Sequence, residues 1–225
     1  MNHLNVNLSL SRNGHTGSTQ MRGKVGKEAV NISIDRQGAH GETLVSGNWG
    51  GKDNVDLVFS RSSTDGYTGI TGEWRGREID VDMDRRVSGD TFVRSGGDSL
   101  EVDRNQNGTQ ARLRGSKVTG SYGRTKSQGD EEGRLRSGDD QVGFRVDRDP
   151  RSGDFVLSGT NSEGGYHLNA DLKSGNEQLN FSGTLPEGAE ELPLLWEILG
   201  DDKLVPDNNP MYPSSLLALS LFVDQ

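Results

Sequence analysis

The chain has no cysteine. This excludes disulfides, thiolate nucleophiles and zinc sites built on cysteine. It also has no run close to the ~18 apolar residues that a membrane-spanning helix needs. The first residues lack the basic and apolar regions of a cleaved signal peptide. We therefore expect a soluble protein with no transmembrane segment and no cleaved leader, in a compartment that the sequence does not specify.

Clusters of basic residues are also missing. The net charge is −9 and the pI is about 5.0, so the chain is acidic. Sequence-independent binding to nucleic acid or to an anionic membrane surface requires grouped lysines and arginines, and here the basic residues are spread along the chain. We therefore expect no nucleic-acid partner.

Large apolar side chains are scarce. Leu, Ile, Val and Phe together make up about 22% of the residues, which is close to the composition at which chains fail to fold. Glycine, with 32 residues, is abundant. Such a chain either stays disordered or folds on a regular scaffold that needs little apolar area per residue. Periodicity decides between these two outcomes.

An alternating segment that ends in arginine recurs along the chain. Clear copies are residues 6–12 (VNLSLSR), 30–36 (VNISIDR), 55–61 (VDLVFSR) and 79–85 (IDVDMDR). The arginines that end successive copies are Arg12, Arg36, Arg61, Arg85, Arg104, Arg124 and Arg148, at spacings of 24, 25, 24, 19, 20 and 24 residues. Alternation of apolar with polar residues predicts a strand with one dry and one wet face.

A second regular column lies half a period further on. It consists of glycines that each follow an apolar residue by two or three places, namely Gly23, Gly47, Gly72, Gly96, Gly115, Gly138, Gly159 and Gly183. Short turn signals such as Asn13-Gly14 and Asn107-Gly108 separate the segments, and joints of this length connect antiparallel strands. The pattern predicts an all-β fold of about eight hairpins, or roughly sixteen antiparallel strands.

A sheet of this width must curl, split or close, because each hairpin alone buries too little surface. A round barrel of sixteen strands encloses a channel, and an empty channel lined with apolar side chains is unstable in water. The sequence therefore predicts either a large filled barrel or a flattened β-roll.

Composition changes sharply near residue 185. Five of the six prolines but only two of the 32 glycines fall in residues 186–225. We therefore divide the chain into a hairpin-repeat domain at 1–185 and an apolar segment at 186–225. Acids and a proline at the start and Gly200 at the end predict a short helix over 189–199. Residues 213–223 are compatible with a helix, a strand or a docking peptide.

We expect this segment to pack on or inside the sheet as a plug that supplies missing core. The alternative is that it docks onto a partner protein or onto a second copy of the chain. The apolar residues proposed for such contacts are Trp196, Leu216, Leu217, Leu219, Leu221 and Phe222.

Two further residue sets are candidates for ligand contact. The repeated arginines, represented by Arg36, Arg61 and Arg85, stand about two strands apart and could bind a repeating anionic polymer, although ion pairs at strand ends are favoured. Trp49 and Trp74 occupy matching places 25 residues apart. They could stack on a sugar, but packing against the core or the sheet edge is favoured.

No catalytic or cofactor motif is complete, and we expect no cofactor. Asp103, Asn105 and Asn107 match the start of a calcium loop, but Arg114 stands where the bidentate Glu is required. Asp80, Asp82 and Asp84 share one strand face, which is compatible with a two-acid polysaccharide hydrolase. A solvated acidic face explains the same residues more simply.

These observations favour a non-enzymatic structural or binding protein built on a repeat β scaffold, with self-assembly or attachment to a surface as options. An alternative from another class is a carrier that holds an apolar ligand inside the barrel. A hydrolase that uses the acidic face is the third and weakest hypothesis.

Overall fold

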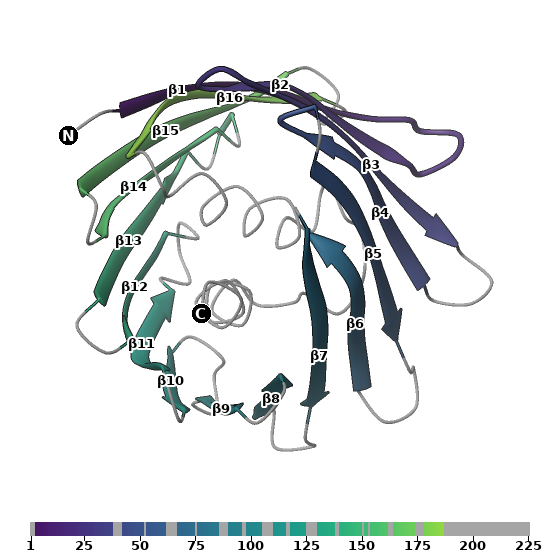
Figure 1. The fold of residues 1–225 in the computed structure, drawn as a ribbon. Coiled ribbons are helices and arrows are strands. Elements are labelled where there is room, and N and C mark those ends of the chain that lie inside the picture. Colours follow the sequence, from purple (N-terminus) through teal and green to yellow (C-terminus); the bar gives the residue numbers. More distant parts are fainter. Residues whose placement is uncertain are drawn as a thin grey trace.

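The structure is a computed structural model in which sixteen antiparallel strands form one closed barrel (Figure 1). It describes residues 3–37, 42–51, 53–61, 67–74, 76–85, 90–95, 98–104, 110–115, 118–124, 130–137, 140–149, 151–152, 154–161, 164–173 and 178–186. The plug proposed for residues 186–225, with its helix over 189–199 and its apolar contact residues, lies outside the described residues apart from Pro186.

The first eight strands are β1 (His3–Arg12), β2 (Thr19–Val25), β3 (Glu28–Gln37), β4 (Glu42–Trp49), β5 (Asp53–Arg61), β6 (Tyr67–Trp74), β7 (Arg77–Arg85) and β8 (Thr91–Ser95). The second eight are β9 (Asp98–Arg104), β10 (Gln110–Gly115), β11 (Val118–Arg124), β12 (Glu131–Ser137), β13 (Asp140–Arg148), β14 (Phe155–Asn161), β15 (Gly164–Lys173) and β16 (Gln178–Pro186). The predicted number of strands and their antiparallel hairpin connections are confirmed.

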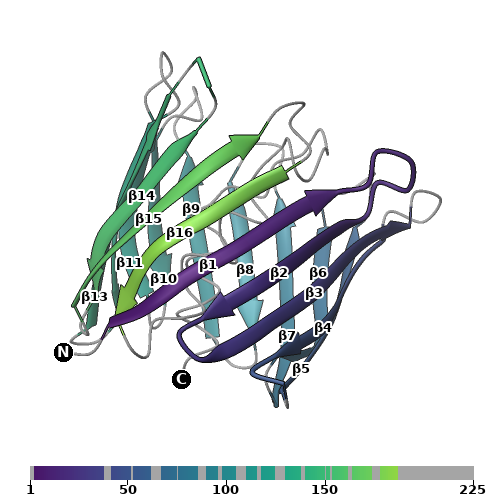
Figure 2. The ribbon, with the colours of Figure 1, turned by 90° about the horizontal axis from the view of Figure 1, so that it is seen from above.

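Each strand pairs with its neighbours in the chain, and β1 pairs with β16 to close the ring. This last pairing runs from His3 opposite Pro186 to Ser11 opposite Gln178. The Gln178 side-chain amide also donates to the Ser9 hydroxyl at 3.0 Å across this seam. Figure 2 shows β1 and β16 side by side, with the strands crossing the wall obliquely. Of the two predicted shapes, the chain therefore adopts the barrel.

Alternate residues of each strand point inward and outward. In β1, Val6, Leu8 and Leu10 are buried, whereas Asn5 and Asn7 between them are exposed. The buried side chains are those on the inner side of the wall, and the exposed ones are on its outer side. Together with their counterparts on the other strands they form a single apolar cluster. No helix among the described residues is long and apolar enough to cross a membrane.

The two ends of the barrel have different connections. At one end the turns are short and contain glycines with positive φ, such as Gly26 at 58° and Gly76 at 80°. At the other end the connections are longer. There the carboxylate of Asp154 accepts a hydrogen bond from the backbone N–H of Leu172 at 2.7 Å, which lowers the pKa of Asp154. The carboxylate of Asp130 binds the N–H of Arg148 in the same way at 2.9 Å.

Four glycines of the predicted column have a backbone that other residues rarely adopt. The φ values are 150° at Gly23, Gly47 and Gly183 and 134° at Gly72. Each lies between inward-facing apolar residues of both neighbouring strands, as Gly47 does between Ile32 and Val55. Glycine kinks at such positions let a sheet bend enough to close. We attribute part of the curvature of the wall to them.

Replacing Gly47 by alanine tests this role. A Cβ there would lie 2.1 Å from the carbonyl oxygen of Asn31, so the change combines steric conflict with backbone strain of about 1–3 kcal/mol. We expect Gly47→Ala to lower the free energy of unfolding by at least that amount in urea titrations followed by circular dichroism. Gly123→Ala is the control, because a Cβ there meets nothing within 4 Å. Equal midpoints for the two variants would show that the kink is dispensable.

Candidate functional site

The two tryptophans proposed as sugar contacts lie in the interior. Trp49 is 1% exposed and Trp74 is 3% exposed, and their ring centroids are 6.0 Å apart with the planes tilted by 56°. The indole N–H of Trp49 donates to the Glu28 carboxylate at 2.8 Å. The indole N–H of Trp74 is buried and has no acceptor among the described residues. The two rings therefore share an apolar setting but differ in hydrogen bonding.

The arginine column lies at the ends of the odd-numbered strands. Arg36, Arg61 and Arg85 each stand opposite a threonine of the next strand. Thr43, the partner of Arg36, is buried, so this end position belongs to the inner face of the wall. The side chains of these three arginines lie outside the part of the chain that the structure describes. In the same column, the Arg148 guanidinium carbon lies 4.8 Å from the centroid of the Phe155 ring.

Of the calcium-loop candidate, Asp103 lies on the outer wall, opposite Arg112. Asp103 ends up beside Arg114, with 3.7 Å between carboxylate oxygen and guanidinium nitrogen. Asn105 and Asn107 lie outside the described residues. Across the described ranges, no three His, Asp or Glu side chains are grouped so that they could hold a metal ion.

The acidic face proposed for hydrolysis is the outer face of β7. Asp80, Asp82 and Asp84 alternate there with the buried Val81 and Met83. The Tyr67 hydroxyl donates to Asp82 at 2.5 Å, and this bond raises the pKa of Tyr67. The three carboxyl groups point the same way from one strand. That arrangement differs from two carboxyl groups that flank a glycosidic bond from opposite sides.

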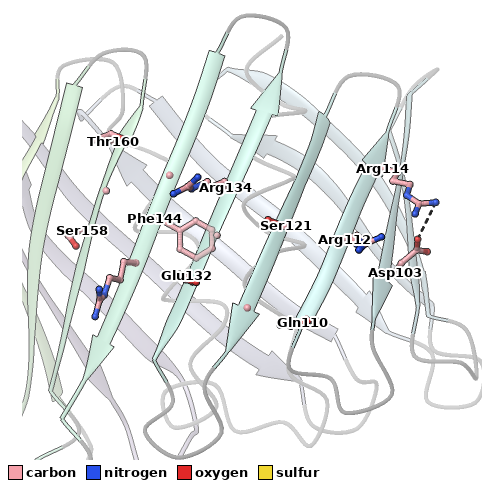
Figure 3. Close-up of a pocket in the computed structure, with 15 residues that line it drawn as sticks. Asp103, Gln110, Arg112, Arg114, Ser121, Glu132, Arg134, Phe144, Ser158 and Thr160 are labelled. Carbon is pink, nitrogen blue, oxygen red and sulfur yellow. Dashed lines mark ion pairs between the residues drawn. The ribbon is translucent and has the colours of Figure 1, made fainter.

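The outer surface of the wall has a hollow that spans β9 to β14. The hollow has a volume of about 960 Å³, and Figure 3 shows the side chains that line it. Its charged lining is Arg112, Arg114, Arg134, Arg145, Asp103 and Glu132, and its hydroxyl lining is Ser121, Ser158 and Thr160. We refer to this feature as the outer groove.

Glycines form the floor of the outer groove. Gly123 and Gly143 stand at outward positions without a side chain, and a Cβ at Gly123 would meet no atom within 4 Å. On the inner side of the same wall, the Phe144 ring lies against Gly133, where a Cβ would be 2.2 Å from a ring carbon. The hydroxyl of Tyr166 donates to the Gly143 carbonyl at 3.1 Å, and burial raises the pKa of Tyr166. Aromatic rings thus support the floor from inside.

Strand register sets four arginines of this outer face in two parallel rows, and three of the four line the groove. In the first row Arg112, Ser121 and Arg134 are direct neighbours on β10, β11 and β12. In the second row Arg114, Thr119 and Arg136 are neighbours on the same three strands. The four arginines, which we call the arginine quartet, are all exposed. Strand geometry spaces them about 9.6 Å apart across β11 and about 6.8 Å apart along each strand.

Members of the quartet differ in their local partners. Arg114 is within 3.7 Å of Asp103, but both side chains are exposed, so this pair contributes little. Arg145 beside the quartet is bound to Asp147 at 2.7 Å, which raises the pKa of Arg145. Within the described ranges, no carboxylate oxygen lies at ion-pair distance from Arg112 or Arg134. These two guanidinium groups, with the Ser121 hydroxyl between them, are therefore available to bind an anion.

The sequence analysis missed the quartet, although a signal was present. The tripeptide Arg-Leu-Arg occurs at 112–114 and again at 134–136. A separation of 22 residues is close to one hairpin period, so both copies fall on the same face two strands apart. No family model, no curated protein and no solved structure matches this chain.

The two interior tryptophans give a matched test of the buried donor. Trp74→Phe removes an N–H that has no acceptor among the described residues, whereas Trp49→Phe removes the N–H that donates to Glu28. Both changes delete a similar apolar area. We expect Trp49→Phe to cost about 1–3 kcal/mol more free energy of unfolding than Trp74→Phe, measured by urea denaturation followed by circular dichroism. A larger loss for Trp74→Phe would show that its N–H is bonded in solution.

Proposed function

We propose that the chain is a non-enzymatic binding protein in which the barrel wall is the scaffold and the arginine quartet binds anionic groups. The observation that carries this proposal is the row formed by Arg112, Ser121 and Arg134. Guanidinium groups bind carboxylate, sulfate and phosphate oxygens through paired hydrogen bonds. A hydroxyl between two arginines adds a third donor to the same anion.

Local charge supports this assignment. The outer groove is lined by four arginines and two acids, whereas the whole chain carries a net charge of −9. A basic site on an acidic protein concentrates anions at one place on its surface. The aromatic residue that lines the groove, Phe144, is 5% exposed, so it offers little area for stacking. Recognition there would depend on charge and on hydroxyl groups.

Carriage of an apolar ligand remains a second candidate, and one observation favours it. The inner wall is apolar, and the Trp74 indole N–H inside it has no acceptor among the described residues. A buried donor of this kind suits the carbonyl or carboxylate oxygen of an otherwise apolar molecule, because an unmade hydrogen bond costs free energy.

The anion-binding proposal predicts affinity for a simple polyanion. We expect dextran sulfate to bind the full chain in isothermal titration calorimetry at about 50 mM salt and to bind much less at about 1 M, where charges are screened within about 3 Å. The double variant Arg112→Gln/Arg134→Gln should lose at least about tenfold in affinity, equivalent to about 1.4 kcal/mol.

Two further variants sharpen this test. Gly143→Val fills the groove without a change of charge, because a Cβ there stands at an ordinary 3.7 Å from the Thr160 hydroxyl, and it should also weaken binding. Arg22→Gln is the control, since Arg22 is an exposed outer-wall arginine on β2 that contacts Asn31. Equal affinity for all variants, or an equal loss in the control, would refute a site at the quartet.

The carrier candidate predicts a bound molecule. Native mass spectrometry of freshly purified protein should show an adduct of lipid size, and Trp74→Phe should reduce its occupancy by removing the donor. If the unaltered chain and Trp74→Phe both showed only the mass of the monomer without an adduct, the carrier function would be ruled out. An adduct of equal occupancy in both would place the ligand away from Trp74.

A further inference from the structure

We infer that the partner of the arginine quartet is the acidic outer face of β5 to β7 on a second copy of this chain. This inference rests on the proposed anion-binding function and names its ligand. The contact is heterologous, because the surface that one copy contributes differs from the surface that the other contributes.

The acidic face contains a row of like charges. Asp56 on β5 is the direct neighbour of Glu73 on β6, and Glu73 is the direct neighbour of Glu78 on β7. All three side chains are exposed. We call these residues the acidic row. Like charges directly opposite each other on adjacent strands are destabilising, so the row has an electrostatic cost in the isolated chain that cations facing it would reduce.

The acidic row and the quartet match in spacing as well as in sign. Both occupy outward positions on three consecutive antiparallel strands, so both follow the same spacing of about 4.8 Å between strands and 6.8 Å between outward residues. Asp56 and Glu78 are two strands apart, as Arg112 and Arg134 are. Glu73 lies between the two acids as Ser121 lies between the two arginines, which places a carboxylate opposite a hydroxyl donor.

The next outward row extends this match. Asp80 on β7 neighbours Thr71, which neighbours Val58 on β5. On the basic side the second row contains Arg114 and Arg136. Asp80 therefore provides a fourth acid at the position that corresponds to one of these arginines. Because the quartet and the acidic residues have the same spacing, they can form several ion pairs without rearrangement of either backbone.

The two surfaces cannot meet within one molecule. The strands β8 and β9 separate them, and Figure 1 shows β5 to β7 and β10 to β12 on different parts of the same convex wall. A heterologous contact repeated from copy to copy forms a ring or an open chain. Because exposed ion pairs are weak one by one, the association should be weak, salt-sensitive and dependent on several pairs together.

Sedimentation velocity of the full chain over a range of concentrations tests the inference. At about 50 mM salt we expect oligomers that grow with concentration, and at about 1 M salt we expect monomers. Arg112→Gln/Arg134→Gln removes the first row of the quartet, and Asp56→Asn/Glu73→Gln/Glu78→Gln removes the acidic row. Each variant alone should be monomeric. An equimolar mixture should form dimers and nothing larger, because each variant retains only one of the two surfaces.

The control carries the same change of charge elsewhere. Asp35→Asn/Glu42→Gln/Asp171→Asn removes three acids from other strands and should associate like the unaltered chain. Circular dichroism and urea midpoints establish that each variant is folded. If a variant fails to fold, Arg112→Glu/Arg134→Glu mixed with Asp56→Lys/Glu78→Lys repeats the test. Each of these variants alone should be monomeric. The mixture should associate, because the unchanged acidic row of the first faces the unchanged quartet of the second and the two reversed surfaces also carry opposite charges.

The two proposals fail separately. The acidic-row variant keeps the quartet, so it should still bind dextran sulfate while it remains monomeric. A chain that binds dextran sulfate but is monomeric at every concentration and low salt would overturn the inference and leave the proposed function intact. A chain that neither binds dextran sulfate nor associates would overturn both. Association that survives loss of the acidic row would place the interface elsewhere.

Discussion

The pairing of β1 with β16 is the contact on which the rest of the barrel depends. It joins the two ends of the described sheet through nine residue pairs and through the side-chain bond between Ser9 and Gln178, which are 169 residues apart. Once the ring is closed, every inward position lies within a single enclosed interior. Loss of this seam would open the wall and expose apolar side chains on both sides of the break. The small share of large apolar residues is sufficient because most of those in the described strands are buried on the inner side.

Closure also separates the chemistry of the two faces. Inward positions are mostly occupied by apolar residues and by glycines such as Gly47, which permit the wall to bend, with threonines such as Thr43 at strand ends. Outward positions do not contribute to the core, so their charges can be grouped. The structure groups acids over β5 to β7 and arginines over β10 to β12, and register converts these groups into rows with defined spacing. The outer groove lies where glycines at outward positions leave space between the arginines.

Much of this fold could be predicted from the sequence, because local features repeat with the period of the hairpins. Alternation and the spacing of residues such as Arg12 and Arg36 give the strands, and Asn-Gly pairs such as Asn13-Gly14 give the turns. The choice between a closed barrel and a flattened roll could not be made from the sequence, because the pairing of the first and last strands leaves no local mark. The quartet was missed because neighbours across strands depend on register, and each Arg-Leu-Arg tripeptide looks like an ordinary solvated strand when it is considered alone. Which residues line the inner side of the strand ends likewise required the register of Arg36 with Thr43.

A ring of strands that closes on itself presents no free backbone donors or acceptors along its wall. A strand of another chain therefore cannot bind by adding to the edge of the sheet. Strand addition of this kind is a common route to both specific peptide binding and aggregation. Every association with this wall must be specified by side chains. The specificity of such binding can be changed by a few substitutions on the outer face while the hydrogen bonds between the strands stay unchanged. A scaffold of this kind can acquire or lose partners without a new fold.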